Sequence, residues 1–198
     1  MTKNTAPNRA PTLRYPHCNR SDLNRAIIKF AKQQARESTH HIILAPHTPM
    51  TMHQSKRLLR KWDGLLNRQI LGGRWNNKEH LHCKWIAFPE HVHSEPHWHL
   101  LWRMSGDLAK AKANKVLSGK FSNGLKYGGR INGKLTHGLD WIVHRHWKRT
   151  ICSGTSKVVR IFDPEGLGYY VTKEQWNSVA YDNIVMSGEF KTSLPKAA

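Results

Sequence analysis

The sequence predicts an α+β fold: a single domain in which a central antiparallel β-sheet is flanked by helices. Two observations support this prediction. The chain has 198 residues, a length typical of one domain, and 38% of them are hydrophobic, which is enough to form one core. Along the chain, segments with helical periodicity alternate with short apolar runs in the order α-β-α-β-β-α-β-β-α.

The first three elements are predicted from capping and periodicity. Ser21 is suited to cap a helix over 22–37, in which apolar side chains fall on one face. The dense apolar run 40–45 (HHIILA) predicts a buried strand. Over 51–70, apolar side chains recur at spacings of three and four while lysine and arginine fill the opposite face, so an amphipathic helix is expected.

A hairpin, a helix and a loop follow. The runs 81–88 and 97–102 are predicted as strands joined by a short turn. The segment 107–117 begins with a capping aspartate and is predicted as a helix. Six glycines among basic residues predict a mobile or hairpin-forming loop over 118–138.

Two strands and a helix complete the domain. The runs 139–147 (LDWIVHRHW) and 157–162 (KVVRIF) are predicted as strands. Asp163 suits the N-cap of a last helix and Pro164 its first turn. Because glycines weaken that first turn, the helix is expected to start at Pro164 or as late as Gly168.

The predicted domain occupies residues 21–185. Residues 1–20 are rich in proline, asparagine and basic side chains and lack periodicity, which predicts a flexible basic arm. Residues 186–198 are predicted to be a C-terminal tail.

The charge balance indicates the class of partner. The chain has 32 Lys and Arg against 13 Asp and Glu, a formal net charge of +19 with neutral histidine. So many positive side chains repel one another in a compact domain, and a polyanionic partner would relieve this repulsion. Nucleic acid is therefore the expected partner.

No apolar run reaches the ~18 residues of a membrane span, and the polar start is not a signal peptide. The widely spaced Cys18, Cys83 and Cys152 argue against a disulfide framework, so we expect a cytoplasmic protein.

Histidines are the unusual feature of the composition, with 14 in the chain. Positions i and i+2 of a strand point to the same face, so a His-x-His pair in a strand presents two imidazoles side by side. The His-x-His pairs are His80/His82, His91/His93, His97/His99 and His144/His146.

The pair His97 and His99 is the best candidate for a metal site. It lies in a predicted strand whose other face is apolar, where packing locks side chains in place. His80 and His82 also lead into a strand and are the rival pair. The pair around Arg145 lies in a basic stretch, which favours contact with phosphate.

A carboxylate is expected to complete this metal site. Glu90 lies at the end of the strand before His97, and a hairpin would bring it close to both imidazoles. Two histidines and one carboxylate suit Mn²⁺ or Mg²⁺ and leave open positions for a substrate oxygen. Glu95 and His91 are alternative third ligands, and the alternative interpretation of Glu90 is an exposed acid at a strand end.

The segment GYYVTK near the C-terminus supplies a second candidate group. On a helix, Tyr170 and Lys173 share a face. A tyrosine nucleophile needs its pKa lowered from about 10, which a nearby ammonium or metal-bound phosphate achieves. Tyr-x-x-Lys is common by itself, and an amphipathic core tyrosine is the alternative. Tyr169, Trp176 and Ala180 have the spacing of a buried stripe, which makes Tyr170 the better candidate nucleophile.

Two segments, EHVHSEPHWH (90–99) followed by LLW and GYYVTK (168–173), together resemble the HUH endonucleases, in particular the rolling-circle replication initiator (Rep) proteins. The resemblance covers residues 39–180 in motif order. It implies a ferredoxin- or RRM-like domain whose sheet presents two histidines and whose helix presents a tyrosine. It also implies metal-dependent nicking and rejoining of single-stranded DNA at a defined site, through a 5′-phosphotyrosine intermediate.

Carried over to this chain, the resemblance makes His97, His99 and Glu90 metal ligands, Tyr170 the nucleophile and Lys173 its helper. The chain has no second tyrosine at Tyr-x-x-x-Tyr spacing, which favours the single-tyrosine enzymes. The expected role is initiation of rolling-circle replication for a bacterial plasmid or phage, with a host replication helicase as a further partner. A transposase or relaxase of the same chemistry, and a non-catalytic nucleic-acid-binding protein, are the alternatives.

Overall fold

The computed structural model describes residues 20–117, 128–173 and 183–190, and over these ranges the predicted α+β fold with a central antiparallel sheet is confirmed. The helices are α1 (Arg20–Glu37), α2 (Met52–Leu71), α3 (Asp107–Leu117), α4 (Gly138–Thr150) and α5 (Pro164–Val171). The strands are β1 (His40–Ala45), β2 (Lys84–Glu90), β3 (His97–Arg103), β4 (Gly128–Ile131), β5 (Lys134–His137), β6 (Thr155–Arg160) and β7 (Val185–Met186). The short 3₁₀ helix η1 (Trp75–Leu81) packs with α2 and α3, and η4 (Ser187–Phe190) contacts β2 and β7. Ser21, predicted as a cap, lies inside α1.

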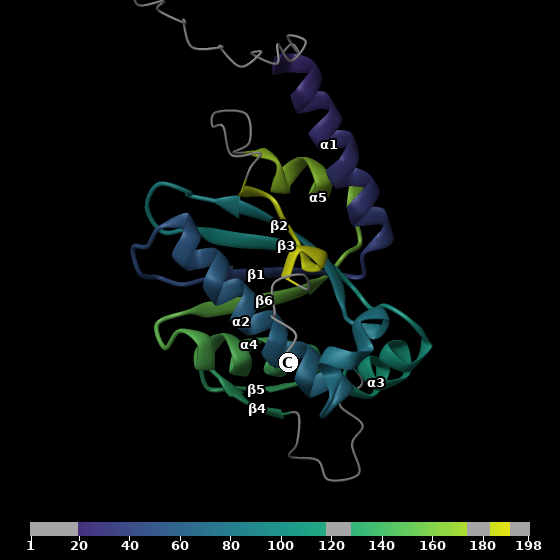
Figure 1. Cartoon of the computed structure of the whole chain (residues 1–198). Helices are drawn as coiled ribbons and strands as arrows, with labels where there is room; N and C mark the ends of the chain where they lie inside the picture. Colours follow the sequence, from purple (N-terminus) through teal and green to yellow (C-terminus); the bar gives the residue numbers. More distant parts are fainter. Residues whose placement is uncertain (1–19, 118–127, 174–182, 191–198) are drawn as a thin grey trace, which may run out of the picture.

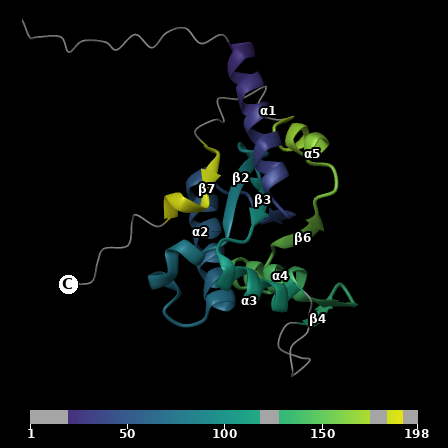
Figure 2. The same cartoon turned by 90° about the vertical axis from the view of Figure 1, so that its right-hand side faces the viewer.

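The main sheet is the middle layer of three. Its strands run antiparallel in the spatial order β6-β1-β3-β2-β7. Helices α1 and α5 cover one face, whereas α2 and α4 cover the other (Figures 1 and 2). A separate hairpin of β4 and β5 packs on α4. Within the described ranges, no helix is long and apolar enough to cross a membrane.

Alternation along the strands divides the core into two parts. On β3, Trp98, Leu100 and Trp102 belong to the larger part, which is shared with α2 and α4. Leu101 belongs to the smaller part, which lies under α1 and α5. The same alternation turns the histidines of β3 toward the α1 and α5 side.

Helix α5 lies close to α1 because a glycine permits it. A Cβ on Gly168 would lie 2.6 Å from the Lys32 Cα, so any larger residue would push the two helices apart. At the start of α5, the Asp163 side chain accepts a hydrogen bond from the Gly166 N–H, and Pro164 occupies the first turn. The cap and the contact with α1 therefore fix a helix that its glycines would otherwise weaken.

The prediction of a strand over 139–147 is wrong, because this run belongs to α4. The buried side chains of the run are Leu139, Ile142, Val143, His146 and Trp147. They recur at spacings of three and four, which places them on one helix face, and α4 packs with β6, α2 and α3. Of the predicted loop 118–138, residues 118–127 lie outside the described residues, and the hairpin-forming alternative is seen for the rest in β4 and β5. The turn of this hairpin holds Asn132 and Gly133 in the left-handed region.

Several predicted boundaries also shift, and β6 spans Thr155–Arg160 rather than 157–162. β2 begins at Lys84 rather than at residue 81, because Leu81 belongs to η1. At the other end, β7 pairs with β2, and the Phe190 ring packs against Trp85 with 5.5 Å between centroids. The chain therefore stays packed on the domain past residue 185. Nearly all of the predicted N-terminal arm lies outside the described residues.

Candidate active site

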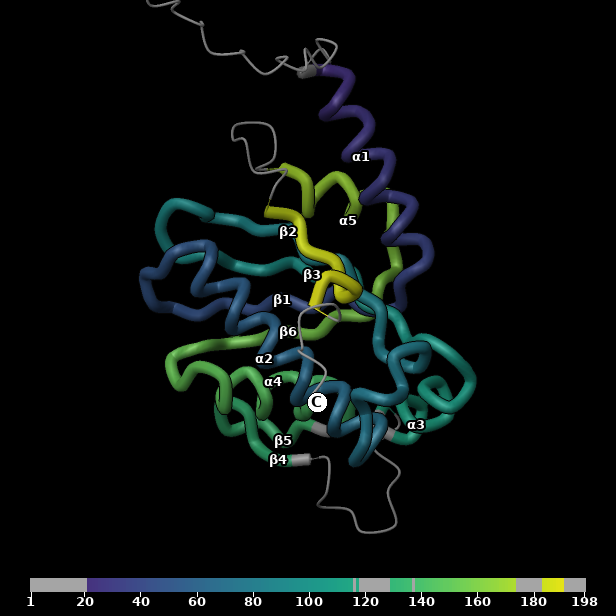
Figure 3. The backbone as a smooth tube through the Cα atoms, in the orientation of Figure 1, coloured from purple at the N-terminus to yellow at the C-terminus, as the bar shows by residue number. Residues whose placement is uncertain are grey.

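The hairpin of β2 and β3 places three predicted site residues on one face of the sheet. Cross-strand pairing sets Glu90 opposite His97, and alternation along β3 turns His97 and His99 the same way. Figure 3 shows the turn of this hairpin next to the β1–α2 connection. There the Met50 N–H donates to the Ser94 carbonyl at 3.3 Å, which joins the two loops.

Glu90 is the centre of a hydrogen-bonded cluster. Its Oε2 lies 2.5 Å from His99 Nε2, and its Oε1 lies 2.6 Å from Lys173 Nζ. Burial alone would raise the pKa of Glu90, but the hydrogen bonds from Lys173 and His99 outweigh it and hold this pKa below its usual value. The carboxylate is therefore charged at neutral pH and suited to bind a cation.

His41 of β1 supports His99 from the other side. Its Nε2 lies 3.1 Å from His99 Nδ1, and both rings are buried. Burial, helped by the charges of His99 and Lys157, lowers the pKa of His41 to about 4. A neutral His41 can accept a hydrogen bond from His99 Nδ1. His99 would adopt this tautomer when a metal replaces the proton that Nε2 otherwise donates to the charged Glu90, so that the Nε2 lone pair faces the metal.

His97 is surrounded by further ligand groups. The ligand atoms of Glu90, His91 and His97 lie within 4.8 Å of one another, and so do those of His47, Glu95 and His97. Burial and the neighbouring His91 lower the pKa of His97, which favours the neutral form that binds metals. His97 Nε2 is buried without a hydrogen-bond partner among the described residues, an orphaned atom that a bound cation would satisfy.

Helix α5 brings Tyr170 to this cluster from a distant part of the sequence. The Tyr170 ring meets the His99 ring edge-on with 5.4 Å between centroids, and the His41 ring at 6.4 Å. Tyr170 is nevertheless 43% exposed, so its outer side is open to a substrate. A tyrosine, two histidines and a glutamate thus meet at one point of the surface.

Tyr169 does not follow the prediction that it belongs to a buried stripe. It is 52% exposed, because α5 buries Gly168 and Val171 against α1 and the sheet instead. The other members of the predicted stripe lie outside the described residues. Contact with the histidines, rather than burial, therefore distinguishes Tyr170 from its neighbour.

Lys173 reaches the cluster from the turn after α5 and not from the helix itself. α5 ends at Val171, where the Thr172 hydroxyl donates to carbonyls of the preceding turn. From this turn Lys173 Nζ lies 4.2 Å from the centre of the Tyr170 ring. The hydrogen bond with Glu90 raises the pKa of Lys173, so it remains a cation at neutral pH.

Two of the other histidine pairs, His80/His82 and His144/His146, lie apart from this cluster. His82 Nε2 is 2.9 Å from the Trp75 carbonyl oxygen on the α2 side of the sheet, and His80 is exposed in η1. The pair around Arg145 lies on α4, where positions i and i+2 do not share a face. His146 is buried, which lowers its pKa to about 4 and removes it from the surface contact with phosphate that the sequence predicts.

Sequence reasoning missed His41 and His47. Neither belongs to a local motif, and both approach His97 or His99 because β1 pairs with β3. That pairing joins segments far apart in the chain. The alternation of side chains along β1 could have indicated His41, because it sets the face of the sheet on which His41 lies. It becomes informative only once the neighbouring strand is known.

Comparison with known proteins gives no match: a scan against protein-family models, a search of curated proteins and a search of solved structures all find none. The geometry of the cluster and its two motifs are therefore what indicate a function.

Proposed function

We propose that this protein is a metal-dependent endonuclease that nicks and rejoins single-stranded DNA, with Tyr170 as the nucleophile. The observation that carries the proposal is the meeting of two distant segments. Glu90 of the hairpin binds both His99 and Lys173, and Tyr170 lies against His99. A partly exposed tyrosine beside a cation and a set of metal-binding side chains supports attack on a phosphodiester.

The cluster fits a divalent cation. Carboxylate and imidazole donors suit Mn²⁺ or Mg²⁺, and the buried His97 Nε2 has no other partner among the described side chains. We assign His97 and Glu90 as ligands together with His99, which binds Glu90 but belongs to neither of the two close groups around His97. His91 and Glu95 do belong to these groups and are the alternative third ligands. Bound there, the cation would polarise the scissile phosphate.

The chain's own residues account for the rest of the reaction. Tyr170 Oη attacks phosphorus, a bond from phosphorus to the tyrosine oxygen forms, and the bond from phosphorus to the 3′ oxygen breaks. The phenol loses a proton and the leaving 3′ oxygen gains one. Lys173 stabilises the negative charge that develops beside the Tyr170 ring. Because the phosphotyrosine keeps the energy of the original bond, a 3′ hydroxyl can reverse the step and rejoin DNA.

Single-stranded DNA is the proposed substrate and partner. The net charge of +19 supports binding to the phosphate backbone. The resemblance of the two motifs to Rep proteins favours initiation of rolling-circle replication for a plasmid or phage, in the bacterial cytoplasm and beside a host helicase. A transposase or relaxase would use the same cluster.

A cleavage assay tests this proposal. The protein is incubated with a library of single strands labelled at the 3′ end, either with Mn²⁺ or with EDTA. We expect a labelled band that migrates with the protein when Mn²⁺ is present and no such band with EDTA. The label stays with the protein because the 3′ fragment carries the phosphotyrosine. His99→Ala should lose this band and keep most DNA affinity, whereas His80→Ala, the matched control in the rival pair, should keep both. Binding without any covalent product would indicate a non-catalytic nucleic-acid-binding protein.

A further inference from the structure

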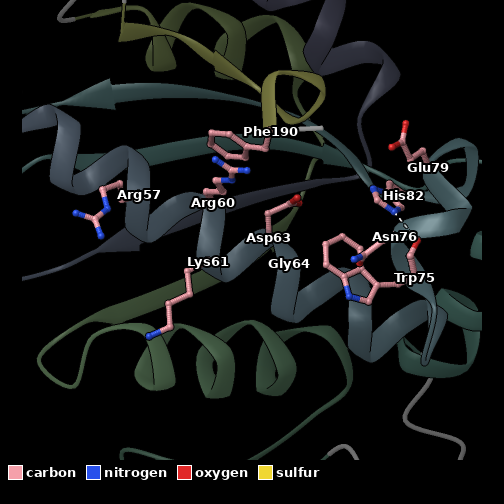
Figure 4. A pocket seen from close by; sticks show the side chains of 10 residues that line it. All are labelled: Arg57, Arg60, Lys61, Asp63, Gly64, Trp75, Asn76, Glu79, His82 and Phe190. Atoms are coloured by element: carbon pink, nitrogen blue, oxygen red, sulfur yellow. Dashed lines mark hydrogen bonds between the residues drawn. The ribbon is translucent and has the colours of Figure 1, made fainter. Parts of the chain in front are cut away.

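A pocket on the opposite face of the sheet takes no part in the chemistry above. It has a volume of about 390 Å³ and lies between α2, η1 and η4 (Figure 4). This volume falls within the range of small-molecule sites, about 300–1,000 Å³. Its lining combines aromatic, basic and acidic side chains, among them Trp75, Phe190, Arg57, Lys61, Asp63 and Glu79.

Two aromatic rings flank this pocket and are held in place. Figure 4 shows Trp75 and Phe190 on either side of the Asp63 side chain. The Trp75 ring packs against His82 with 5.1 Å between centroids, and Phe190 packs against Trp85 at 5.5 Å. Rings fixed in this way offer a stacking surface for a flat aromatic ligand, as they do for the bases of single strands.

The space beside Trp75 exists because α2 has a glycine there. Gly64 lies inside α2, where glycine is a poor helix former, and it lines the pocket. A Cβ on Gly64 would lie 3.5 Å from the Trp75 ring, an ordinary contact. Packing therefore does not require glycine at this position. Its effect is to leave room in the wall, which a longer side chain would fill.

The pocket lining carries charges of both signs. Arg57 and Lys61 are exposed and lie one turn apart on α2, on the face that also carries Gly64. Among the acidic residues of the lining, Asp63 is buried, whereas Glu79 is exposed. The Asp63 carboxylate is held by the indole N–H of Trp85, which donates to it at 2.7 Å. Arg60 is half-buried and lies beside Phe190 (Figure 4). Cations and carboxylates in one lining suit a ligand that joins a phosphate to N–H donors.

We propose that this pocket binds one nucleobase together with its phosphate. The base stacks on Trp75 and Phe190, its amino group donates to the carboxylate of Asp63 or Glu79, and the phosphate pairs with the cations of α2. The carboxylates favour adenine, cytosine and guanine, which carry amino groups, over thymine, which does not.

Within the proposed nicking function, on which this inference rests, the occupant is a base of the bound strand. β2 connects the two places: Trp85 near its start contacts the pocket wall, and Glu90 at its end belongs to the active site. Its 7 residues span about 20 Å. The pocket therefore reads a base several nucleotides from the cut and adds sequence preference to a contact that charge alone would leave unspecific.

Binding of short oligonucleotides to the Tyr170→Phe protein tests this proposal, since that background is not expected to cut. Affinities are measured by fluorescence anisotropy for strands that are all adenine, all cytosine or all thymine. Adding Gly64→Leu fills the pocket and should weaken binding of adenine and cytosine strands by about 5- to 150-fold, the value of one stacked base. The preference for adenine and cytosine strands over thymine strands should also disappear in this variant.

Three controls separate the pocket from charge and folding. Gly64→Ala fits without filling the space and should keep the preference. Arg57→Gln should weaken binding of every strand and lower the salt slope by about 1. Arg68→Gln removes an equal charge from the same helix outside the pocket and should keep the base preference. If Gly64→Leu does not fold by circular dichroism, Trp75→Ala provides the same readout.

The outcomes distinguish this proposal from the proposed function. An unchanged base preference in folded Gly64→Leu would overturn the pocket proposal, even if protein with Tyr170 intact still forms a covalent product with DNA. Loss of the preference without a covalent product in any protein would support the pocket and contradict the nicking function. A third outcome is that the protein binds free dAMP and that Gly64→Leu removes this binding but leaves strand binding unaffected. That outcome would assign the pocket to free nucleotides and overturn its role in reading the strand.

Discussion

His41 is expected to control metal binding without touching the metal. Its Nε2 lies 3.1 Å from His99 Nδ1, and the two residues are only 8% and 4% exposed. Replacing His41 with leucine fills a similar volume but removes the acceptor for the His99 N–H. His99 then turns more freely or keeps its proton on Nε2, where it is donated to Glu90, and either change disfavours a metal.

The magnitude follows from the buried hydrogen bond. Leaving one partner of a buried hydrogen bond without the other costs about 1–3 kcal/mol, which corresponds to about 5- to 150-fold in an equilibrium constant. Groups that orient metal-binding histidines contribute about 10- to 100-fold to metal affinity. We therefore expect His41→Leu to raise the Kd for Mn²⁺ by about 10- to 100-fold. His41→Gln, which keeps an acceptor oxygen, should raise it much less.

Free Mn²⁺ measured by electron paramagnetic resonance gives the affinities directly. The matched control is His53→Leu, which removes an exposed histidine from α2. Thermal unfolding without metal checks that His41→Leu still folds. Equal Mn²⁺ affinities of the wild type and His41→Leu would refute the idea that His41 holds His99 for the metal.

Three other perturbations have defined outcomes. Glu90→Gln should abolish nicking and return the pKa of Lys173 toward its usual value, because the charged partner is lost; retained cleavage would contradict the role of Glu90. His146→Leu should stabilise the fold by about 1–3 kcal/mol in urea unfolding, because both His146 ring nitrogens are buried without partners among the described residues. The pKa of His146 is about 4 in the folded state and 6.5 in the unfolded state, so the unfolded state binds more protons between these two pH values. This histidine therefore lowers the stability of the fold as the pH falls from 6.5 toward 4, and His146→Leu should make that decline shallower. Affinity for single-stranded DNA should fall steeply between ~50 and ~200 mM salt, and a flat response would mean that the positive charge serves another partner.

The features that were predictable from sequence depend on local pattern. Strand alternation places His97 and His99 on one face, and a short hairpin places Glu90 beside them, so their proximity follows from residues close in the chain. Density of aromatic and β-branched residues misled the prediction for 139–147. Its buried side chains recur at spacings of three and four, which is the helical period, and α4 packs with α2, α3 and β6.

The features that were not predictable depend on contacts between distant segments. Nothing near His41 in the sequence shows that β1 lies beside β3. The position of Tyr170 depends on the contact of Gly168 with Lys32 of α1, which periodicity does not reveal. Lys173 was expected on a helix, but the helix ends before it, and the turn delivers the ammonium to the same place.

The identity of the residue bonded to DNA tests the central claim most directly. Trypsin cuts after Arg160 and Lys173, so one peptide, 161–173, carries both tyrosines, and fragment spectra of the trapped adduct separate them. We predict that the nucleotide mass lies on Tyr170, that Tyr170→Phe forms no adduct, and that Tyr169→Phe still forms it. A nucleotide on Tyr169, or undiminished adduct formation by Tyr170→Phe, would contradict the assignment of the nucleophile.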